Sequence, residues 1–382
     1  MLLKRHWSKM SDPHYHLQDL LFKAENGASL SRQNITDLLN LEDPQQTLML
    51  FETARKIRWR YFGKRIFLYG FLYTSTYCRN DCSFCFFRSS NPDSTRYRKA
   101  KPDILSAAQR LAESGVHLID LTMGEDPLLF NDRGDGFEQL LDLVVSLKQT
   151  TGLPVMISPG VMTTSQLKML IRAGASWYAC YQETHNRQLF AELRPKQNFD
   201  TRMAAKINAH ANGLLIEEGL LCGVGETLDD MAHSLTTMKD LQADQIRAMT
   251  FIPQPGTPMA ANAPVGAHRE TILTAVMRLV FPDIMIPASL DVDGIDGLKR
   301  RLDAGANVVT SIVPPGAGLA GVARPSLGIE DNKRTVGAVT GVLATCGLET
   351  ATQEEYGRWI IGRQRVIGQN NVRRHTPKQD IA

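Results

Sequence analysis

Apolar residues recur along most of the chain in a repeating pattern. Amphipathic segments, with apolar residues three or four positions apart, are followed by a glycine and then by a short apolar run. A glycine just beyond a helix adopts the left-handed conformation that ends the helix and turns the chain. The glycines at these boundaries are Gly115, Gly174, Gly213 and Gly305. The pattern predicts a repeated unit of helix, turn and strand.

Eight apolar runs are predicted to be strands. The first is RIFLYGFLYTST (65–76), four follow the glycines above, and the others lie in 154–160, 245–253 and 283–291. Strands that alternate with helices in this number predict an α/β fold, a parallel sheet closed into a (β/α)₈ TIM barrel. Residues 65–315 supply the roughly 250 residues that such a barrel takes. An open doubly wound sheet is the alternative.

The barrel is predicted to be the middle of three parts. Residues 1–62 form an N-terminal helical extension, with helices over 30–41 and 45–58, and residues 63–320 form the barrel. Residues 321–382 contain one helix (330–347) and a basic, polar tail (362–382). A frayed, solvated terminus is favoured for this tail over an RNA-binding segment.

Composition and charge limit the classes of partner that this protein is expected to bind. The 382 residues are 43% hydrophobic and 22% charged, as in ordinary folded proteins. A net charge of +3 offers no electrostatic case for nucleic acid. No apolar run has the roughly 20 residues of a membrane helix, and the first residues lack the apolar stretch of a secretory signal. We expect a cytoplasmic protein without a nucleic-acid or membrane partner.

Three of the six cysteines, Cys78, Cys82 and Cys85, form a CxxxCxxC motif after the first predicted strand. In a reduced cytosol such a group predicts a metal site and not disulfides. Three thiolates leave one iron of a [4Fe–4S] cluster open to bind a substrate directly. A structural zinc ion would need a fourth ligand, and the closest downstream histidine is His117. The other cysteines are expected to be small apolar residues.

The CxxxCxxC spacing resembles the signature of the radical S-adenosylmethionine (SAM) superfamily. In that superfamily SAM chelates the open iron, and the reduced cluster cleaves it to methionine and a 5′-deoxyadenosyl radical. The resemblance implies one [4Fe–4S] cluster, SAM, and an external one-electron reductant of the flavodoxin or ferredoxin type. An iron–sulfur electron carrier is the alternative outside catalysis, and it would need every iron to be ligated and no SAM site.

The residues next to these cysteines extend the resemblance. Phe84 matches the superfamily position beside the adenine of SAM. The segment LIDLTMGEDP (118–127) resembles the second-strand region, which implies that Gly124 and Glu125 meet the amino group of SAM. A loop that carries acidic residues without a ligand is the alternative for this segment.

A later segment resembles one branch of the superfamily, which contains biotin synthase and the hydrogenase-maturation protein HydE. In YQETHNRQLFAELRP (181–195) the resemblance implies that Glu183 binds the ribose hydroxyls of SAM and that Arg194 binds its methionyl carboxylate. Arginine suits bidentate pairing with a carboxylate. Ser158 is a further expected SAM contact.

Several long segments resemble the methylornithine synthase family within that branch, among them TSTYCRNDCSFCFFR, QIRAMTF and IPASLDVDGIDG. That family rearranges L-lysine into (3R)-3-methyl-D-ornithine, the first step of pyrrolysine biosynthesis. Hydrogen abstraction, fragmentation to a glycyl radical and an alkenylamine, and recombination make up the reaction. The resemblance implies an isomerase with no catalytic group beyond the cluster and SAM.

Two enzyme alternatives are weighed against this isomerase. One is a HydE-type lyase that acts on another amino acid. The other is a sulfur-insertion enzyme like biotin synthase, whose second cluster needs cysteines where this chain has Met156 and Glu217.

Four polar residues at predicted strand ends, where barrel ligands lie, suit lysine. They are Asp120, Arg247, Ser289 and Asp291. Lysine has two ammonium groups and one carboxylate, so burying it requires about two carboxylates and one arginine. The resemblance implies that Arg247 binds the α-carboxylate, Ser289 and Asp291 the α-ammonium, and Asp120 the distal ammonium. Asp293 and Asp296 are close enough in sequence to Asp291 to be alternatives.

Overall fold

The eight predicted strands form one nearly closed parallel barrel. The computed structural model describes residues 13–131, 134–321, 323 and 333–375. The strands are β1 (Arg65–Ser75), β2 (Leu118–Met123), β3 (Val155–Ser158), β4 (Ala175–Ala179), β5 (Leu215–Cys222), β6 (Gln245–Thr250), β7 (Pro287–Ser289) and β8 (Val308–Ile312). Their order is β6-β5-β4-β3-β2-β1-β8-β7, and a single parallel bridge between Gln245 and Met285 links the two ends. The predicted (β/α)₈ barrel is confirmed.

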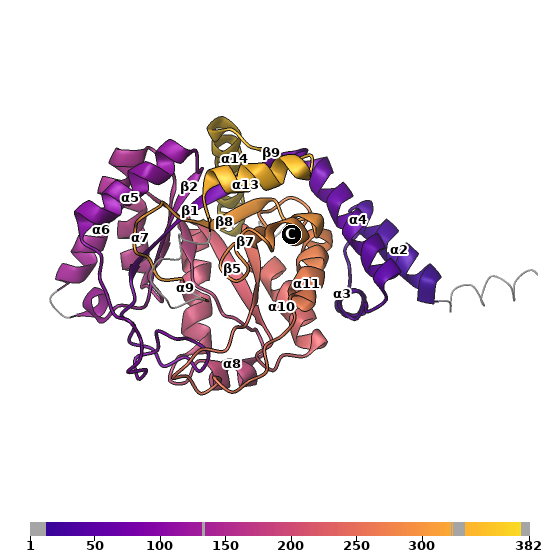
Figure 1. Cartoon of the computed structure of the whole chain (residues 1–382), viewed down its shortest axis with the longest axis horizontal. Helices are drawn as coiled ribbons and strands as arrows, with labels where there is room; N and C mark the ends of the chain where they lie inside the picture. Colours follow the sequence, from indigo (N-terminus) through magenta and orange to yellow (C-terminus); the bar gives the residue numbers. More distant parts are fainter. Residues whose placement is uncertain (1–12, 132–133, 322, 324–332, 376–382) are drawn as a thin grey trace, which may run out of the picture.

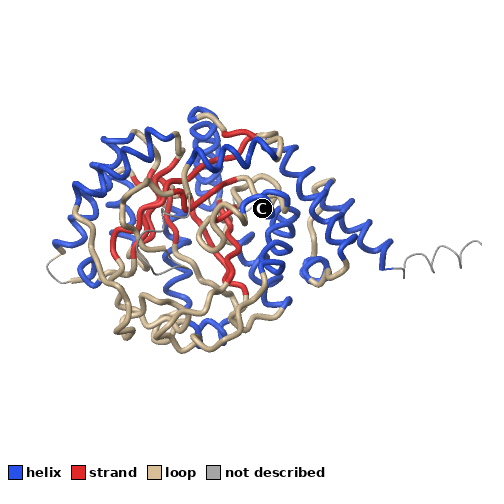
Figure 2. Tube along the Cα trace, viewed as in Figure 1, coloured by secondary structure: helices blue, strands red, loops and turns tan. Residues whose placement is uncertain are grey.

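Helices surround this sheet, which is enclosed at the centre of the molecule in Figures 1 and 2. They are α5 (Lys101–Ser114), α6 (Asp135–Thr151), α7 (Thr164–Ala173), α8 (Arg187–Leu193), α9 (Phe199–Ala211), α10 (Leu228–Asp240), α11 (Ala267–Val280) and α12 (Leu298–Asp303), with a short 3₁₀ helix η1 (Pro127–Phe130). The four boundary glycines have φ values of 94° to 105°, as their turn role requires. No helix in the described ranges is long and apolar enough to cross a membrane.

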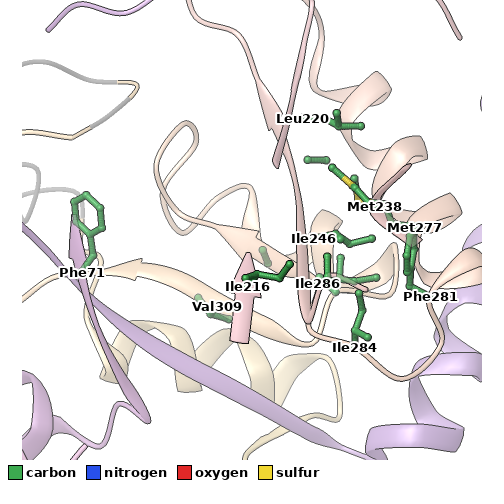
Figure 3. Close-up of a cluster of buried hydrophobic side chains, with 14 of the residues drawn as sticks. Phe71, Ile216, Leu220, Met238, Ile246, Met277, Phe281, Ile284, Ile286 and Val309 are labelled. Carbon is green, nitrogen blue, oxygen red and sulfur yellow. The ribbon is translucent and has the colours of Figure 1, made fainter. Parts of the chain in front are cut away.

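The main hydrophobic core lies between the strands and the helices. Strand residues alternate between the barrel interior and this outer layer. Figure 3 shows part of that layer, where Ile246 of β6 and Ile286 lie near Met277 and Phe281 at the end of α11. All four side chains are buried, and each such burial stabilises the fold by roughly 1.5–3 kcal/mol.

Three helices precede the barrel: α2 (Pro13–Glu25), α3 (Arg32–Leu39) and α4 (Pro44–Phe62). They lie beside α10 and α11, at the right of Figure 1. Side-chain oxygens of Ser31 and Asp43 cap α3 and α4 by accepting hydrogen bonds from backbone N–H groups. The predicted helices over 30–41 and 45–58 are confirmed, and residues 1–12 lie outside the described ranges.

The C-terminal region closes the amino-terminal end of the barrel. It contains α13 (Val336–Thr345), β9 (Glu349–Thr350) and α14 (Gln353–His375), and β9 pairs with β1. In α14, Tyr356 donates a 2.9 Å hydrogen bond to the hydroxyl of Tyr69, and the Trp359 ring stacks on Trp177 with a centroid separation of 5.8 Å. The helix α13 confirms the prediction over 330–347 for the described residues 333–347.

The predicted frayed tail over 362–382 is wrong for residues 362–375, which continue α14. The reason is that this basic stretch has buried contacts. Ile367 is buried, and Arg363 pairs with the carboxylate of Asp244 at 2.9 Å. Residues 376–382 lie outside the described ranges.

Tyr356→Ala is expected to lower the free energy of unfolding by about 3–5 kcal/mol, the usual cost of truncating a fully buried large aromatic side chain. Tyr356 is 1% exposed, and its ring packs against Phe67, Tyr69 and His117. Denaturant unfolding measures the loss. Ile361→Ala is the matched control, because Ile361 lies on the same helix and is 51% exposed, so its change should stay within about 0.5 kcal/mol. Equal losses in the two variants would contradict the packing role of α14.

Candidate active site

A cavity opens at the carboxyl ends of the strands, where the active sites of such barrels lie. It holds about 1000 Å³ of empty space, including its open mouth. Its lining includes the predicted site residues Phe84, Cys85, Asp120, Ser158, Glu183, Arg247, Ser289 and Asp291. The structure therefore brings parts of the predicted cluster, SAM and substrate sites around one space. The predicted residues that do not line it are Cys78, Cys82, Gly124, Glu125 and Arg194.

The loop after β1 carries the three cysteines and is tied down at several points. The guanidinium of Arg96 donates hydrogen bonds to the carbonyls of Phe87 at 2.9 Å and Arg88 at 2.6 Å. The backbone N–H of Ser83 donates to the carbonyl of Leu193, at the end of α8, at 2.8 Å. These bonds hold the cysteine loop against the barrel mouth.

The surroundings of the sulfur atoms fit a cluster held by three thiolates. Cys82 Sγ accepts hydrogen bonds from Gln197 Nε2 at 3.1 Å and Arg194 Nη1 at 3.4 Å, and such donors stabilise thiolates. Burial raises the pKa of Cys78 to about 11, so this thiol stays protonated until a metal displaces the proton. A Cβ at Gly124 would lie 2.3 Å from the carbonyl oxygen of Tyr77, so only glycine lets the loop after β2 approach the cysteine loop this closely.

Glu183 presents an unsatisfied carboxylate oxygen within the cavity wall. Its backbone is in the left-handed region, with φ of 68°, which is uncommon outside glycine and is found at functional sites. Oε1 accepts a 2.7 Å hydrogen bond from Arg194 Nη2, whereas Oε2 is buried and no described residue donates to it. Burial raises the pKa of Glu183, and Arg194 opposes that rise. A ligand with hydroxyl donors would satisfy Oε2, which fits the ribose of SAM.

A buried ion pair behind the wall supports this conformation. Glu218 Oε1 accepts hydrogen bonds from the backbone N–H groups of Gln182 at 2.7 Å and Gly219 at 2.9 Å, the residues that immediately precede Glu183 and Leu220, which form a parallel bridge. Lys206 pairs with Glu218 and donates to the side chain of Gln182 at 2.9 Å. Such pairs add little net stability, so their main effect here is to fix the backbone next to Glu183.

Arg247 is held from two sides and keeps one donor group free. Nε donates to Glu217 Oε1 at 2.8 Å and Nη1 to Thr310 Oγ1 at 3.1 Å, while Nη2 is buried and has no hydrogen-bond partner in the described part of the chain. Glu217 also accepts hydrogen bonds from Gln245 Nε2 at 2.6 Å and from the Tyr181 hydroxyl at 2.7 Å. In the sequence, Glu217 stands out only as a position that lacks a cysteine, so its role beside Arg247 was not predicted. The sequence signal that could have revealed this role is the presence of a charged residue, Glu217, within the largely apolar strand β5.

Asp120 is a carboxylate that forms no ion pair with any residue that the structure describes. It is 6% exposed, and it accepts one hydrogen bond, from Thr122 Oγ1 at 3.0 Å. Burial, and then the nearby charge of Glu217, raise its pKa to about 7. The other carboxylates along the described lining are paired: Glu183 with Arg194, Glu270 with Arg301, and Asp291 with Arg334. The cavity therefore contains one negative charge that a bound cation would compensate.

Ser289 and Asp291 lie at the end of β7, as predicted. The Asp291 N–H donates to Ser289 Oγ at 3.2 Å. The Asp291 carboxylate already accepts hydrogen bonds from Arg334 at 3.2 Å and from the N–H of Ala323 at 2.7 Å. Each carboxylate oxygen has a second lone pair, so a ligand ammonium still has acceptors. Of the alternatives, Asp293 pairs with Arg300 and Arg301, and neither it nor Asp296 lines the cavity in the described structure.

Glu125 is buried outside the cavity and pairs with two arginines, of which Arg202 is buried and Arg79 is exposed. Its Oε2 pairs with Arg79 at 3.2 Å, and its Oε1 pairs with Arg202 at 3.1 Å and accepts from the N–H of Val161 at 3.2 Å. Burial by itself would raise the pKa of Glu125, but Arg202 and the other donors lower it below its ordinary value. Glu125 thus joins the loops after β1, β2 and β3 to α9. The contact of Glu125 with SAM remains a prediction. The pairing of Arg202 with Glu125 was not predicted from the sequence.

Comparisons with known proteins agree with this geometry. Residues 72–238 match the family model of the radical SAM superfamily. The 3-methylornithine synthase of Methanosarcina acetivorans is 41% identical over 334 residues, which cover 87% of this chain and 94% of that protein. The chain belongs to the methylornithine synthase family of radical SAM enzymes. The crystal structure of a methylornithine synthase (PylB) superposes with a TM-score of 0.84 at 40% identity, covering 89% of this chain and 99% of that one.

The chain is also similar to a more distant relative. The [FeFe] hydrogenase maturase subunit HydE of Thermotoga maritima is 29% identical over 296 residues, covering 76% of this chain and 82% of that protein. The predicted superfamily, enzyme class and fold are therefore confirmed. Membership in the methylornithine synthase family implies SAM and a [4Fe–4S] cluster as cofactors.

Proposed function

We propose that this enzyme converts L-lysine to (3R)-3-methyl-D-ornithine in the cavity. The observation that carries the proposal is that two groups line the same cavity: Asp120, which forms no ion pair among the described residues, and Arg247, whose Nη2 has no hydrogen-bond partner among them. The two charges are close enough to shift each other's pKa. A small molecule with a cation at one point and a carboxylate at another would satisfy both groups.

Charge balance favours a substrate with a second ammonium group. Asp120 and Glu217 carry two negative charges, and Arg247 returns one positive charge, so this group has a net charge of −1 when ionised. L-Lysine has a net charge of +1, and binding it makes the buried group neutral. An α-amino acid with an uncharged side chain would leave Asp120 without a partner, which is costly in a buried site.

The cofactors are proposed to be held on one side of this chamber. Cys78, Cys82 and Cys85 hold the cluster, and SAM is contacted by Phe84, Gly124, Glu125, Ser158, Glu183 and Arg194. When bound, these groups supply the deoxyadenosyl radical that abstracts a side-chain hydrogen from the substrate. An external one-electron reductant of the flavodoxin or ferredoxin type, acting in the cytoplasm, completes the proposal.

The residues of the chain are proposed to orient and enclose the substrate. Arg247 binds its α-carboxylate, Ser289 and Asp291 its α-ammonium, and Asp120 its distal ammonium. Holding both charged ends of lysine keeps the two fragments of the broken carbon skeleton in place until they recombine. The apolar residues of the lining exclude water, which protects a radical from quenching.

Anaerobic reconstitution with SAM, dithionite and side-chain-deuterated L-lysine tests the function. Lysine and 3-methylornithine are isomers, so the abstracted hydrogen has to return to the product. We expect 3-methylornithine by mass-resolved amino-acid analysis, and deuterium in the recovered SAM and the product. Stoichiometric release of deoxyadenosine, with no label in SAM, would instead indicate a lyase of the HydE type and would overturn the proposal.

The affinity for lysine is expected to rise with pH through about 7. Asp120, whose pKa is raised to about 7, is neutral below that pH and binds an ammonium group only when it is ionised. Below the pKa, the KM for lysine should increase roughly tenfold for each unit of pH. KM measured between pH 5.5 and 8 in wild type and Asp120→Asn checks this. The Asn variant should bind weakly at every pH with a flat profile, and a sloping profile in that variant would assign the titration to another group.

A further inference from the structure

Strand β8 contains an irregularity at the cavity wall. In its pairing with β1, Leu68 lies opposite Val309 and Gly70 lies opposite Ile312. Tyr69 therefore faces two residues of β8, Thr310 and Ser311, which is the pattern of a β-bulge. Ser311 has φ of 64°, a left-handed conformation that is strained for a serine. Bulges of this kind re-aim a side chain, and they are frequent next to active sites.

The bulge turns two consecutive side chains towards the barrel interior. In a regular strand neighbouring side chains point to opposite faces. Here Val309 and Ile312 pack in the outer core, and Figure 3 shows Val309 there. Thr310 accepts the hydrogen bond from Arg247, while Ser311 lines the cavity and is 4% exposed.

Each of the two hydroxyls contacts a different part of the amino-acid site. Thr310 Oγ1 lies 3.1 Å from Arg247 Nη1, which is assigned to the α-carboxylate. Ser311 Oγ lies 3.3 Å from Ser289 Oγ, which is assigned to the α-ammonium. In an α-amino acid these two charged groups are bonded to the same carbon atom. Adjacent residues on one strand therefore contact the residues assigned to both groups.

We propose that Ser311 is a further substrate-binding residue that accepts a hydrogen bond from the α-ammonium group beside Ser289. Thr310 is a positioning residue that sets the guanidinium of Arg247 for the neighbouring carboxylate. This inference rests on the proposed amino-acid substrate. On this proposal, the bulge selects α-amino acids over amines that lack the α-carboxylate and over acids that lack the α-ammonium.

Ser311→Gly separates the hydroxyl from the backbone conformation, because glycine adopts φ of 64° without strain. Binding of L-lysine and of 6-aminohexanoate, which lacks the α-ammonium, is measured by calorimetry on the anaerobically reconstituted holoenzyme with SAM. We expect the affinity for lysine to fall roughly tenfold or more, the effect of losing a hydrogen bond to a charged group. The affinity for 6-aminohexanoate should stay unchanged.

Gln242→Gly is the matched control, since Gln242 also has a left-handed backbone, with φ of 58°, but lies before β6 and away from the cavity. It should bind both ligands as wild type does. Unchanged lysine binding in Ser311→Gly, equal losses for the two ligands, or a loss in Ser311→Ala alone would overturn the inference. Turnover of lysine by the wild type tests the proposed function separately.

Discussion

Cys78→Ala, Cys82→Ala and Cys85→Ala are each expected to abolish both cluster assembly and SAM cleavage. Three thiolates leave one iron open for SAM, and the loss of one more ligand leaves the cluster with too few protein bonds to persist. Iron and sulfide analysis after anaerobic reconstitution, and deoxyadenosine formation with dithionite, measure the two effects. Both readouts should fall to the background of the apoprotein.

The other cysteines supply matched controls within the same chain. Cys180 and Cys222 are buried, and Cys346 is partly exposed beyond α13. Cys180→Ala, Cys222→Ala and Cys346→Ala should retain about four irons per chain and full SAM cleavage. About eight irons in the wild type, or loss of iron in a control variant, would contradict a single cluster on the CxxxCxxC motif.

The barrel could be predicted because its signals are local. Each strand is a short apolar run, and each boundary glycine lies within a few residues of the helix that it ends, as Gly115 and Gly174 do after α5 and α7. The cavity residues Asp120 and Arg247 could be predicted for a related reason. The carboxyl ends of parallel barrel strands meet at one face, so a polar residue at such an end is expected to lie at the active site.

The ion-pair partners of the site could not be predicted, because they are distant in sequence. Glu217 lies 30 residues before Arg247, and Arg202 lies 77 residues after Glu125. Periodicity determines that a side chain faces inward, but the choice of partner depends on strand order and register. The same reason explains the missed bulge at Ser311, which exists only in the pairing between β1 and β8.

The helix α14 was mispredicted because composition and packing disagree. Its basic and polar residues are typical of a solvated tail. Its folded state depends on a few apolar contacts with the barrel floor, such as Trp359 on Trp177, and on the ion pair between Arg363 and Asp244. The partners of these contacts, Trp177 and Asp244, lie more than a hundred residues earlier in the chain. No local pattern in 362–382 predicts the contacts.

Arg247→Lys is expected to lower kcat/KM for lysine by roughly two to three orders of magnitude, although the charge is kept. The guanidinium donates to Glu217 through Nε and to Thr310 through Nη1, and its Nη2 has no hydrogen-bond partner among the described residues. The ammonium group of lysine is a compact point charge without the planar fork of a guanidinium, so it cannot hold both wall contacts and also present a donor to a carboxylate. The KM for SAM should change little, because the SAM contacts proposed here do not include Arg247.

Arg278→Lys controls for the general cost of replacing a buried arginine. Arg278 is 0% exposed on α11 and donates to backbone carbonyls, including Gly305 at 3.0 Å and Ile284 at 3.1 Å, outside the cavity. This variant should lose stability in denaturant unfolding but keep the wild-type KM for lysine. Arg247→Lys should show the reverse, a loss of kcat/KM much larger than its loss of stability. If the two variants instead lost activity only in proportion to their stability, Arg247 would be a structural residue of the barrel wall, and the carboxylate of the substrate would have to bind elsewhere.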